Sequence, residues 1–112
     1  MSDYPKKAII VEGKTDKARI LKVLDEKIDI ICTFGTINME KLEHLIDLER
    51  YQDIYVWADA DEAGKELRRK IKIVYPQVRD LYTQKKYREV AATPLDVLAQ
   101  ILDKAHFSVK KI

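Results

Sequence analysis

Three acidic side chains stand just after two apolar stretches of the chain, and their types indicate metal-assisted chemistry on phosphate esters. Glu12 follows residues 7–11, and Asp59 and Asp61 follow residues 54–58. Carboxylate oxygens are the ligands that Mg²⁺ or Mn²⁺ prefers. Such an ion neutralises a phosphodiester and makes a bound water more acidic, while Glu12 is the better placed of the three acids to carry a proton. Crowding should also raise the pKa of at least one of these carboxyl groups when metal is absent.

Each acid also has an ordinary structural interpretation. Asp61 can cap a helix that begins at Glu62, and Asp59 can be a turn residue. The metal-site interpretation therefore depends on tertiary structure, because Glu12 must reach the two aspartates from a neighbouring strand end.

The elements that must bring these acids together are strands alternating with helices. Strands are predicted at residues 7–11, 29–34, 54–58 and 78–82, and helices at 16–28, 38–48, 62–75 and 93–105. This βαβαβαβα order requires parallel strands joined by right-handed crossovers, and thus an α/β sandwich.

The spatial order of the strands follows from their apolar content. The first and third are the most uniformly apolar, so they are expected side by side at the centre of a short parallel four-stranded sheet with the order 2-1-3-4. The chain then reverses direction across the sheet between these two strands, and their carboxyl ends form the crevice where open α/β sheets bind ligands. Glu12, Asp59 and Asp61 are all expected there.

Local signals mark where the helices should begin. Gly13 turns the chain sharply off the first strand, and either Thr15 or Asp16 is expected to cap the helix that follows. Thr93 before Pro94 predicts a cap with a proline at the first helical residue.

Basic side chains are expected around the same crevice. They are Lys14, Lys65, Arg68 and Arg69. Contact with backbone phosphates would release counterions and make binding sensitive to salt. The alternative for the helical residues is a solvated face with a Glu66–Lys70 pair, and Lys14 is as easily explained as a solvated lysine.

A second basic stretch follows the fourth predicted strand. It contains Lys85, Lys86 and Arg88, with Tyr82 and Tyr87 interleaved. Such a mixture is either a patch that stacks bases and neutralises phosphates of single strands, or a basic loop with partly buried tyrosines.

Composition limits the class of protein. The 112 residues are enough for one domain, expected over 1–112 with a core at about 5–105, and too few for two. The net charge of +2 permits a polyanionic partner without requiring one. The single Cys32 and the lack of a signal peptide or long apolar span predict a cytoplasmic location and no membrane association. Residues 107–112 form either a short strand or a frayed tail.

Two motifs resemble those of the Toprim domain. This domain is shared by type IA and type II topoisomerases, bacterial primases, recombination-repair proteins, OLD-family nucleases and a small ribosomal-RNA maturation nuclease. The motifs are Val-Glu-Gly-Lys-Thr-Asp at residues 11–16 and Asp-Ala-Asp-Glu-Ala-Gly-Lys at residues 59–65, and the resemblance covers about residues 5–105. It implies a Toprim-like three-layer sandwich.

The resemblance also assigns roles to single residues. It implies that Glu12 is a general acid or base or a metal ligand, and that Asp59 and Asp61 coordinate Mg²⁺. The positions that match the turn glycines of the family are Gly13, Gly35 and Gly64.

The nuclease branch of the family is the most similar, because its members also combine Glu-Gly-Lys-x-Asp with Gly and basic residues after the second motif. The resemblance thus implies a Mg²⁺-dependent nuclease, or another phosphodiester-acting protein, for structured RNA or DNA. Two alternatives stay open: a nucleic-acid-binding or adaptor module that depends on a protein partner, and a phosphate- or nucleotide-binding domain. The chain has no room for the tyrosine-bearing domain of a topoisomerase or the polymerase module of a primase, so neither activity is expected from it alone.

Overall fold

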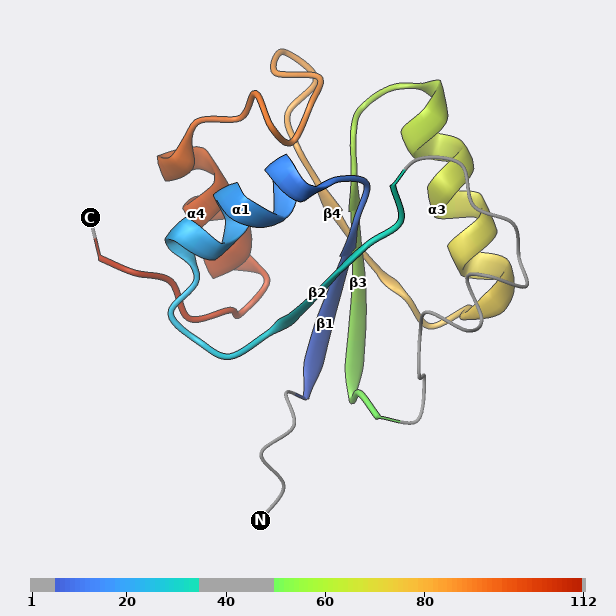
Figure 1. Ribbon diagram of the computed structural model, residues 1–112, viewed down its shortest axis with the longest axis horizontal. Coiled ribbons are helices and arrows are strands. Elements are labelled where there is room, and N and C mark those ends of the chain that lie inside the picture. Colours follow the sequence, from blue (N-terminus) through green and yellow to red (C-terminus); the bar gives the residue numbers. More distant parts are fainter. Residues whose placement is uncertain (1–5, 35–49, 112) are drawn as a thin grey trace.

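A parallel four-stranded sheet forms the centre of the computed structural model, which describes residues 6–34 and 50–111 (Figure 1). The strands are β1 (Lys7–Val11), β2 (Asp29–Cys32), β3 (Asp53–Ala58) and β4 (Arg79–Tyr82). The helices are α1 (Lys14–Val23), α3 (Glu62–Val74) and α4 (Leu95–Lys104). The helix predicted at 38–48 and the turn glycine Gly35 lie outside the described residues.

The strand order is β2-β1-β3-β4, and all three pairings are parallel. This confirms the predicted α/β class and the order 2-1-3-4. β1 and β3 are central because their apolar side chains are buried on both faces. Ile10 pairs with Val56 in the register of these two strands, so the residues that follow them emerge at the same edge of the sheet.

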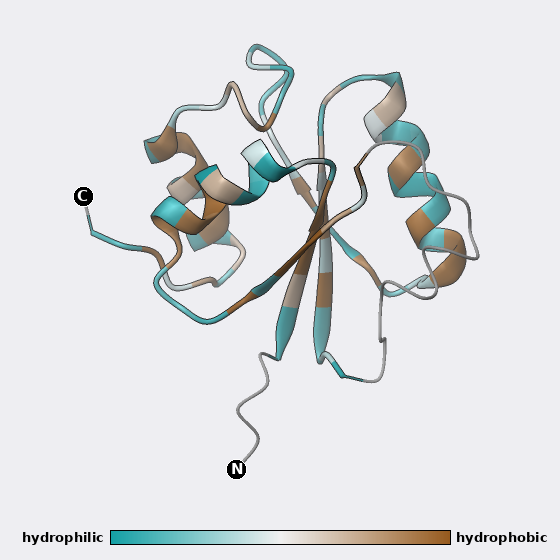
Figure 2. Ribbon diagram, viewed as in Figure 1, coloured by the Kyte–Doolittle hydropathy of each residue, from teal (hydrophilic) through white to brown (hydrophobic). Residues whose placement is uncertain are grey.

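Helices cover both faces of the sheet, as a three-layer sandwich requires. Figure 1 shows α1 and α4 on one face and α3 on the other. Alternate residues of each central strand enter different cores: Ile9 and Trp57 pack with α1 and α4, whereas Ile10 and Val56 pack with α3. Figure 2 shows the apolar central strands between helices that are polar on their outer sides.

The first helix begins earlier than the sequence predicts. Its N-cap is Gly13 and its first residue is Lys14, so the prediction of Thr15 or Asp16 as the cap is wrong. Asp16 lies within the first turn, where its carboxylate accepts a hydrogen bond from the Gly13 N–H at 3.0 Å. An acid in the first turn can thus satisfy a free backbone N–H from inside the helix.

The last helix begins later than the sequence predicts. Pro94 is the N-cap of α4, and the prediction that Thr93 caps it is wrong. Thr93 is fully buried, and its hydroxyl donates to the Glu89 carbonyl at 2.9 Å and contacts the Thr83 hydroxyl. Thr93 therefore holds together the two ends of the loop between β4 and α4.

The chain after α4 packs against the end of α1. Val109 forms an antiparallel bridge with Leu24, and the Asp25 N–H donates to the Ser108 carbonyl at 2.8 Å. Phe107 is buried, with its ring centroid 4.8 Å from that of Tyr55. The described part of this segment is therefore held in place rather than frayed. None of the helices in the described ranges has the length and apolar character needed to cross a membrane.

Candidate active site

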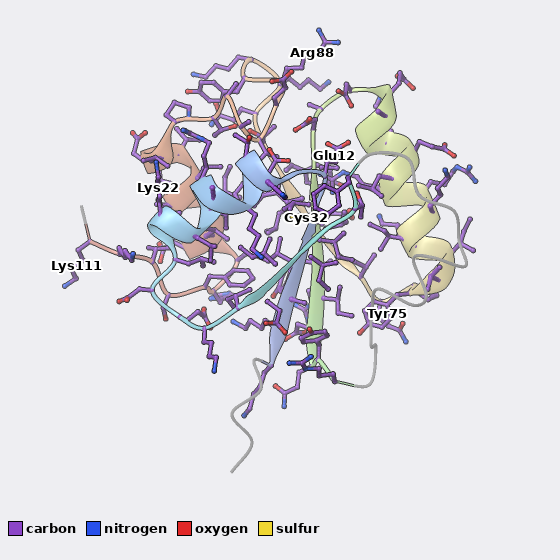
Figure 3. The ribbon with its side chains drawn as sticks, viewed as in Figure 1. Glu12, Lys22, Cys32, Tyr75, Arg88 and Lys111 are labelled. Atoms are coloured by element: carbon purple, nitrogen blue, oxygen red, sulfur yellow. The ribbon has the colours of Figure 1, made fainter. Side chains whose placement is uncertain are left out.

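The carboxyl ends of β1 and β3 bring the three sequence-predicted acids together. The Asp59 N–H donates to Glu12 Oε2 at 3.0 Å, and the charges of both Asp59 and Asp61 act on Glu12. Figure 3 shows Glu12 at the end of β1, beside the end of β3. Glu12, Asp59 and Asp61 are called the acid cluster below.

Each acid of the cluster accepts a hydrogen bond from a backbone N–H. Besides the Glu12 contact, Asp59 Oδ1 accepts from Val90 at 2.8 Å, and Asp61 Oδ1 accepts from Gly64 at 2.8 Å. Asp61 is the N-cap of α3, so the interpretation of this residue as a helix cap is confirmed. A cap position does not exclude a second role, because a carboxylate has free lone pairs after one hydrogen bond.

The two described turn glycines differ in how strictly they are needed. A Cβ on Gly64 would lie 2.0 Å from the Asp59 carbonyl oxygen, so only glycine allows α3 to pack this closely against the acid cluster. Gly13 has a φ of −143°, an extended conformation open to any residue, and a Cβ there would come no nearer than 3.8 Å to Asp16. Gly13 therefore links β1 to α1 in a conformation that does not depend on the freedom of glycine.

Burial and charge raise the pKa of Glu12 to about 7 from an ordinary value of 4.5. Desolvation is the largest cause, the hydrogen bond from the Asp59 N–H opposes it, and repulsion from Asp59 and Asp61 adds to it. The direction agrees with the expectation from crowding, although burial contributes more. Burial also raises the pKa of the neighbouring Asp16, and the charges of Asp59 and Glu89 act in the same direction.

The raised pKa of Glu12 predicts that the metal-free protein loses stability as the pH rises. Below about 4.5 the folded and unfolded states both hold this proton; between 4.5 and about 7 the folded state retains a proton that the unfolded state has released. The free energy of unfolding therefore falls across this window, by on the order of 1 kcal/mol after allowance for solvent screening. Melting temperatures from pH 4 to 8 in a chelator should show this slope, and Glu12→Gln should reduce it. Identical slopes for both proteins would contradict the assignment.

The loop between β4 and α4, residues 83–94, closes over the acid cluster through its backbone. The Val90 N–H binds Asp59, and the Arg88 carbonyl accepts from the Ala60 N–H at 2.6 Å. The Arg19 side chain holds the far end of the loop by donating to the Thr93 carbonyl at 2.6 Å. The sequence did not predict the contacts of the Val90 N–H and the Arg88 carbonyl, because these backbone groups are present in almost every residue type.

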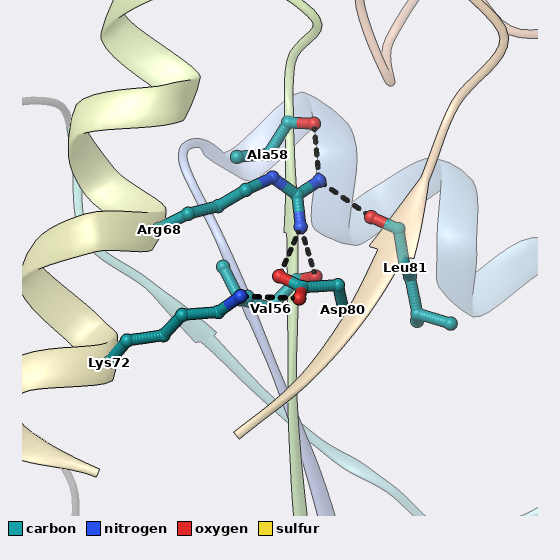
Figure 4. A network of polar contacts seen from close by, with 6 residues as sticks. All are labelled: Val56, Ala58, Arg68, Lys72, Asp80 and Leu81. Carbon is teal, nitrogen blue, oxygen red and sulfur yellow. Dashed lines mark hydrogen bonds and ion pairs between the residues drawn. The ribbon is translucent and has the colours of Figure 1, made fainter. Parts of the chain in front are cut away.

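Arg68 does not have the role that the sequence suggested. Its Nη1 donates to Asp80 Oδ1 and Val56 O at 2.8 and 3.3 Å, and its Nη2 donates to Ala58 O and Leu81 O at 3.2 and 2.6 Å (Figure 4). These bonds use both N–H groups of each terminal nitrogen. The prediction that Arg68 contacts phosphate is therefore corrected: this guanidinium joins α3 to the ends of β3 and β4.

The other predicted basic residues are exposed, and Lys65 lines a pocket together with Asp59 of the cluster. Lys65 is 3.4 Å from Glu62, and the Arg69 Nε donates to Glu66 at 3.1 Å. Both pairs are exposed, so the cations can exchange these partners for a phosphate at little cost. Lys14 is exposed at the first residue of α1.

The donor set of the acid cluster fits a hard divalent cation, and each of its carboxylates also accepts one backbone hydrogen bond. Three carboxylates with mutual repulsion are the oxygen ligands that Mg²⁺ takes. Within residues 6–34 and 50–111, no three Asp, Glu, His or Cys side chains are arranged to hold a metal ion.

Comparison with known proteins gives a consistent result. The Toprim domain profile matches residues 7–93. The solved structure of a small TOPRIM domain protein from Bacillus stearothermophilus has 50% sequence identity and a TM-score of 0.88, and the match covers 94% of this chain and 89% of that one.

Two curated relatives illustrate how far the similarity extends. The uncharacterized protein YusF of Bacillus subtilis is 42% identical over 110 residues, which are 98% of this chain and 75% of that protein. Ribonuclease M5 of Mycoplasma capricolum is 34% identical over 67 residues, which are 59% of this chain and 37% of the ribonuclease. The similarity to the ribonuclease is thus limited to a part of each protein.

Proposed function

The chain belongs to the Toprim domain family, and from that premise we propose that it is a Mg²⁺-dependent nuclease acting on structured RNA or DNA. The observation that carries the proposal is the contact between Glu12 and Asp59, which joins the ends of two strands that are far apart in the sequence. The similarity to ribonuclease M5 supports a nucleic acid as the partner.

Toprim domains generally bind Mg²⁺, and Asp59, Asp61 and Glu12 would hold the ion in this chain. When bound, the ion would neutralise charge on the phosphodiester and lower the pKa of a water molecule. In the metal-free protein the pKa of Glu12 is about 7, close to neutrality. If Asp59 and Asp61 hold the ion, the Glu12 carboxyl group can take up or release a proton. Lys14, Lys65 and Arg69 would attract and orient the phosphate backbone.

One observation favours a second candidate, a nucleic-acid-binding module whose catalysis depends on a protein partner. Asp59 Oδ1 accepts from the Val90 N–H of the 83–94 loop, so the position of this loop affects one ligand of the acid cluster. A partner that displaces the 83–94 loop would release the Asp59 carboxylate from Val90. Metal-dependent cleavage of RNA or DNA by the isolated chain separates the two candidates, because the second would bind the metal ion and the nucleic acid without cutting.

Mg²⁺ is expected to raise the melting temperature of the isolated protein at pH 7.5, because a ligand that binds only the folded state stabilises it. At about one hundred times the dissociation constant the gain is about 2.7 kcal/mol. The double variant Asp59→Asn with Asp61→Asn should lose this rise. Asp103→Asn, an exposed acid on α4, should keep it. If Mg²⁺ does not raise the melting temperature of the wild-type protein, the proposal of a metal site in the isolated chain is wrong.

A further inference from the structure

A pocket of about 700 Å³ lies beside the acid cluster, between the start of α3, the end of β4 and the 83–94 loop. Its wall includes Asp59 of the cluster, an aromatic ring and several cations. The side chains used below are Tyr82, Arg68, Lys65, Lys85 and Arg88. The volume is in the range of sites for small organic ligands, which runs from about 300 to 1,000 Å³.

Tyr82 gives this pocket a flat and firmly placed apolar surface. It is the last residue of β4 and is paired in register with Ala58, yet it is 61% exposed. The Arg68 guanidinium carbon lies 4.2 Å from the ring centroid. Since Arg68 is itself fixed by four hydrogen bonds to the sheet ends, the ring rests on a rigid support. The exposed area then belongs to the ring edge and to the face away from Arg68.

Two cations at the rim of the pocket are available to an anionic ligand. Lys85 and Arg88 are exposed, and within the described part of the chain neither side chain has a hydrogen bond or an ion pair. The Arg88 backbone has a φ of 61° and its carbonyl is bonded to Ala60. The left-handed conformation costs a residue other than glycine free energy, and it is kept only where surrounding contacts hold the backbone in place. Figure 3 shows Arg88 at the outer end of the loop, above Glu12 in that view.

We propose that this pocket receives one unpaired nucleotide of a nucleic-acid strand. Its base stacks on Tyr82, its flanking phosphates contact Lys85 and Arg88, and the adjoining phosphodiester reaches the acid cluster. The inference rests on the proposed function and narrows its substrate class to strands with a single-stranded segment at the reacting bond.

The chemistry of the pocket selects an unpaired base over other anionic ligands. A base inside a duplex already stacks on both faces, so it cannot also cover the Tyr82 ring. An inorganic phosphate would use the cations alone and would gain nothing from an exposed aromatic surface. A stacked base uses both the ring and the cations beside it.

The test is binding of a short fluorescent oligonucleotide, as RNA and as DNA, single-stranded and as the matching duplex, measured by anisotropy in a chelator that prevents cleavage. Tyr82→Ala should weaken single-strand binding by about 5- to 150-fold, the range that corresponds to loss of one stacked base. Duplex binding should change by less than about twofold. Tyr82→Phe should retain single-strand affinity, because the ring rather than the hydroxyl makes the contact. A 2-aminopurine base in the strand should lose fluorescence on binding to wild type but not to Tyr82→Ala.

The cations are tested by salt dependence. Lys85→Ala and Arg88→Ala should each lower the slope of log affinity against log salt by about 0.7 for single strands. Lys111→Ala removes the same charge from the far end of the molecule in Figure 3 and should leave the slope unchanged.

The outcomes separate this inference from the proposed nuclease activity. Tyr82-dependent binding of single strands by a protein that cuts nothing would support the pocket and contradict the nuclease. Metal-dependent cleavage with equal affinity of wild type and Tyr82→Ala for single strands would support the nuclease and overturn the pocket. A mononucleotide that binds as tightly as the oligonucleotide would also overturn the assignment to a strand. A melting curve of Tyr82→Ala checks that the variant is folded. If it is not, loss of 2-aminopurine fluorescence on binding to both wild type and Tyr82→Phe supports the pocket, and unchanged fluorescence overturns it.

Discussion

Glu12→Gln is expected to lower the rate of Mg²⁺-dependent phosphodiester cleavage by about 100- to 10,000-fold, the usual contribution of a general acid or base. Glutamine has the same shape and can still accept the hydrogen bond from the Asp59 N–H. It cannot exchange a proton, and it takes one negative charge away from the metal ligands. The fold should therefore persist while the chemistry is lost.

The measurement is single-turnover cleavage of labelled RNA and DNA with Mg²⁺ or Mn²⁺, in wild type and variants purified in the same way. Glu66→Gln is the matched control, because Glu66 is an exposed acid on α3 whose partner is Arg69. Its rate should stay within about twofold of wild type. If Glu12→Gln cuts at the full rate, the cleavage comes from a contaminant or from other residues.

Arg68→Met is expected to destabilise the protein by about 3–5 kcal/mol, the usual cost of removing one partner from a largely buried ion pair. The Arg68 and Asp80 side chains are only 11% and 17% exposed. Burial alone would raise the pKa of Asp80, but its hydrogen bonds and ion pairs with Lys72 and Arg68 outweigh this and hold the pKa below its ordinary value. Methionine has a similar length but leaves Asp80 with Lys72 alone and the carbonyls at the strand ends without their donor.

Arg69→Met is the matched control for this change. It removes the same side chain one residue away on the same helix, where the ion pair with Glu66 is exposed. Such pairs contribute about 0–1 kcal/mol. In urea unfolding followed by circular dichroism, the free energies of unfolding of the two variants should therefore differ by at least about 2 kcal/mol. The slope of this free energy against urea concentration should be the same for both. If both variants unfold at the same urea concentration, the hydrogen bonds of Arg68 contribute little to stability.

The sheet and the convergence of the acids were predictable from the sequence because both depend on patterns within single strands. The continuous apolar runs that became β1 and β3 needed cover on both faces, and strands alternating with helices had to be parallel. Once those two strands are neighbours, Glu12 and Asp59 must meet at their carboxyl ends, as their hydrogen bond shows.

The helix starts were harder to predict because several residues compete for the same backbone groups. Asp16 satisfies the Gly13 N–H from inside the first turn of α1, whereas the sequence predicted the cap at Thr15 or Asp16. Thr93 has the side chain of a good cap, but its hydroxyl is used within the 83–94 loop. Tertiary contacts thus override the local preference of a side chain.

The sequence by itself determined which strands lie at the centre of this protein and at which edge its acids meet. It did not determine the roles of the two adjacent arginines. Arg68 and Arg69 are separated by about 100° around α3, so one turns toward the ends of β3 and β4 and the other toward solvent. Only the packing of α3 on the sheet made Arg68 a structural cation and left Arg69 exposed to solvent. The same packing set Tyr82 against a fixed guanidinium.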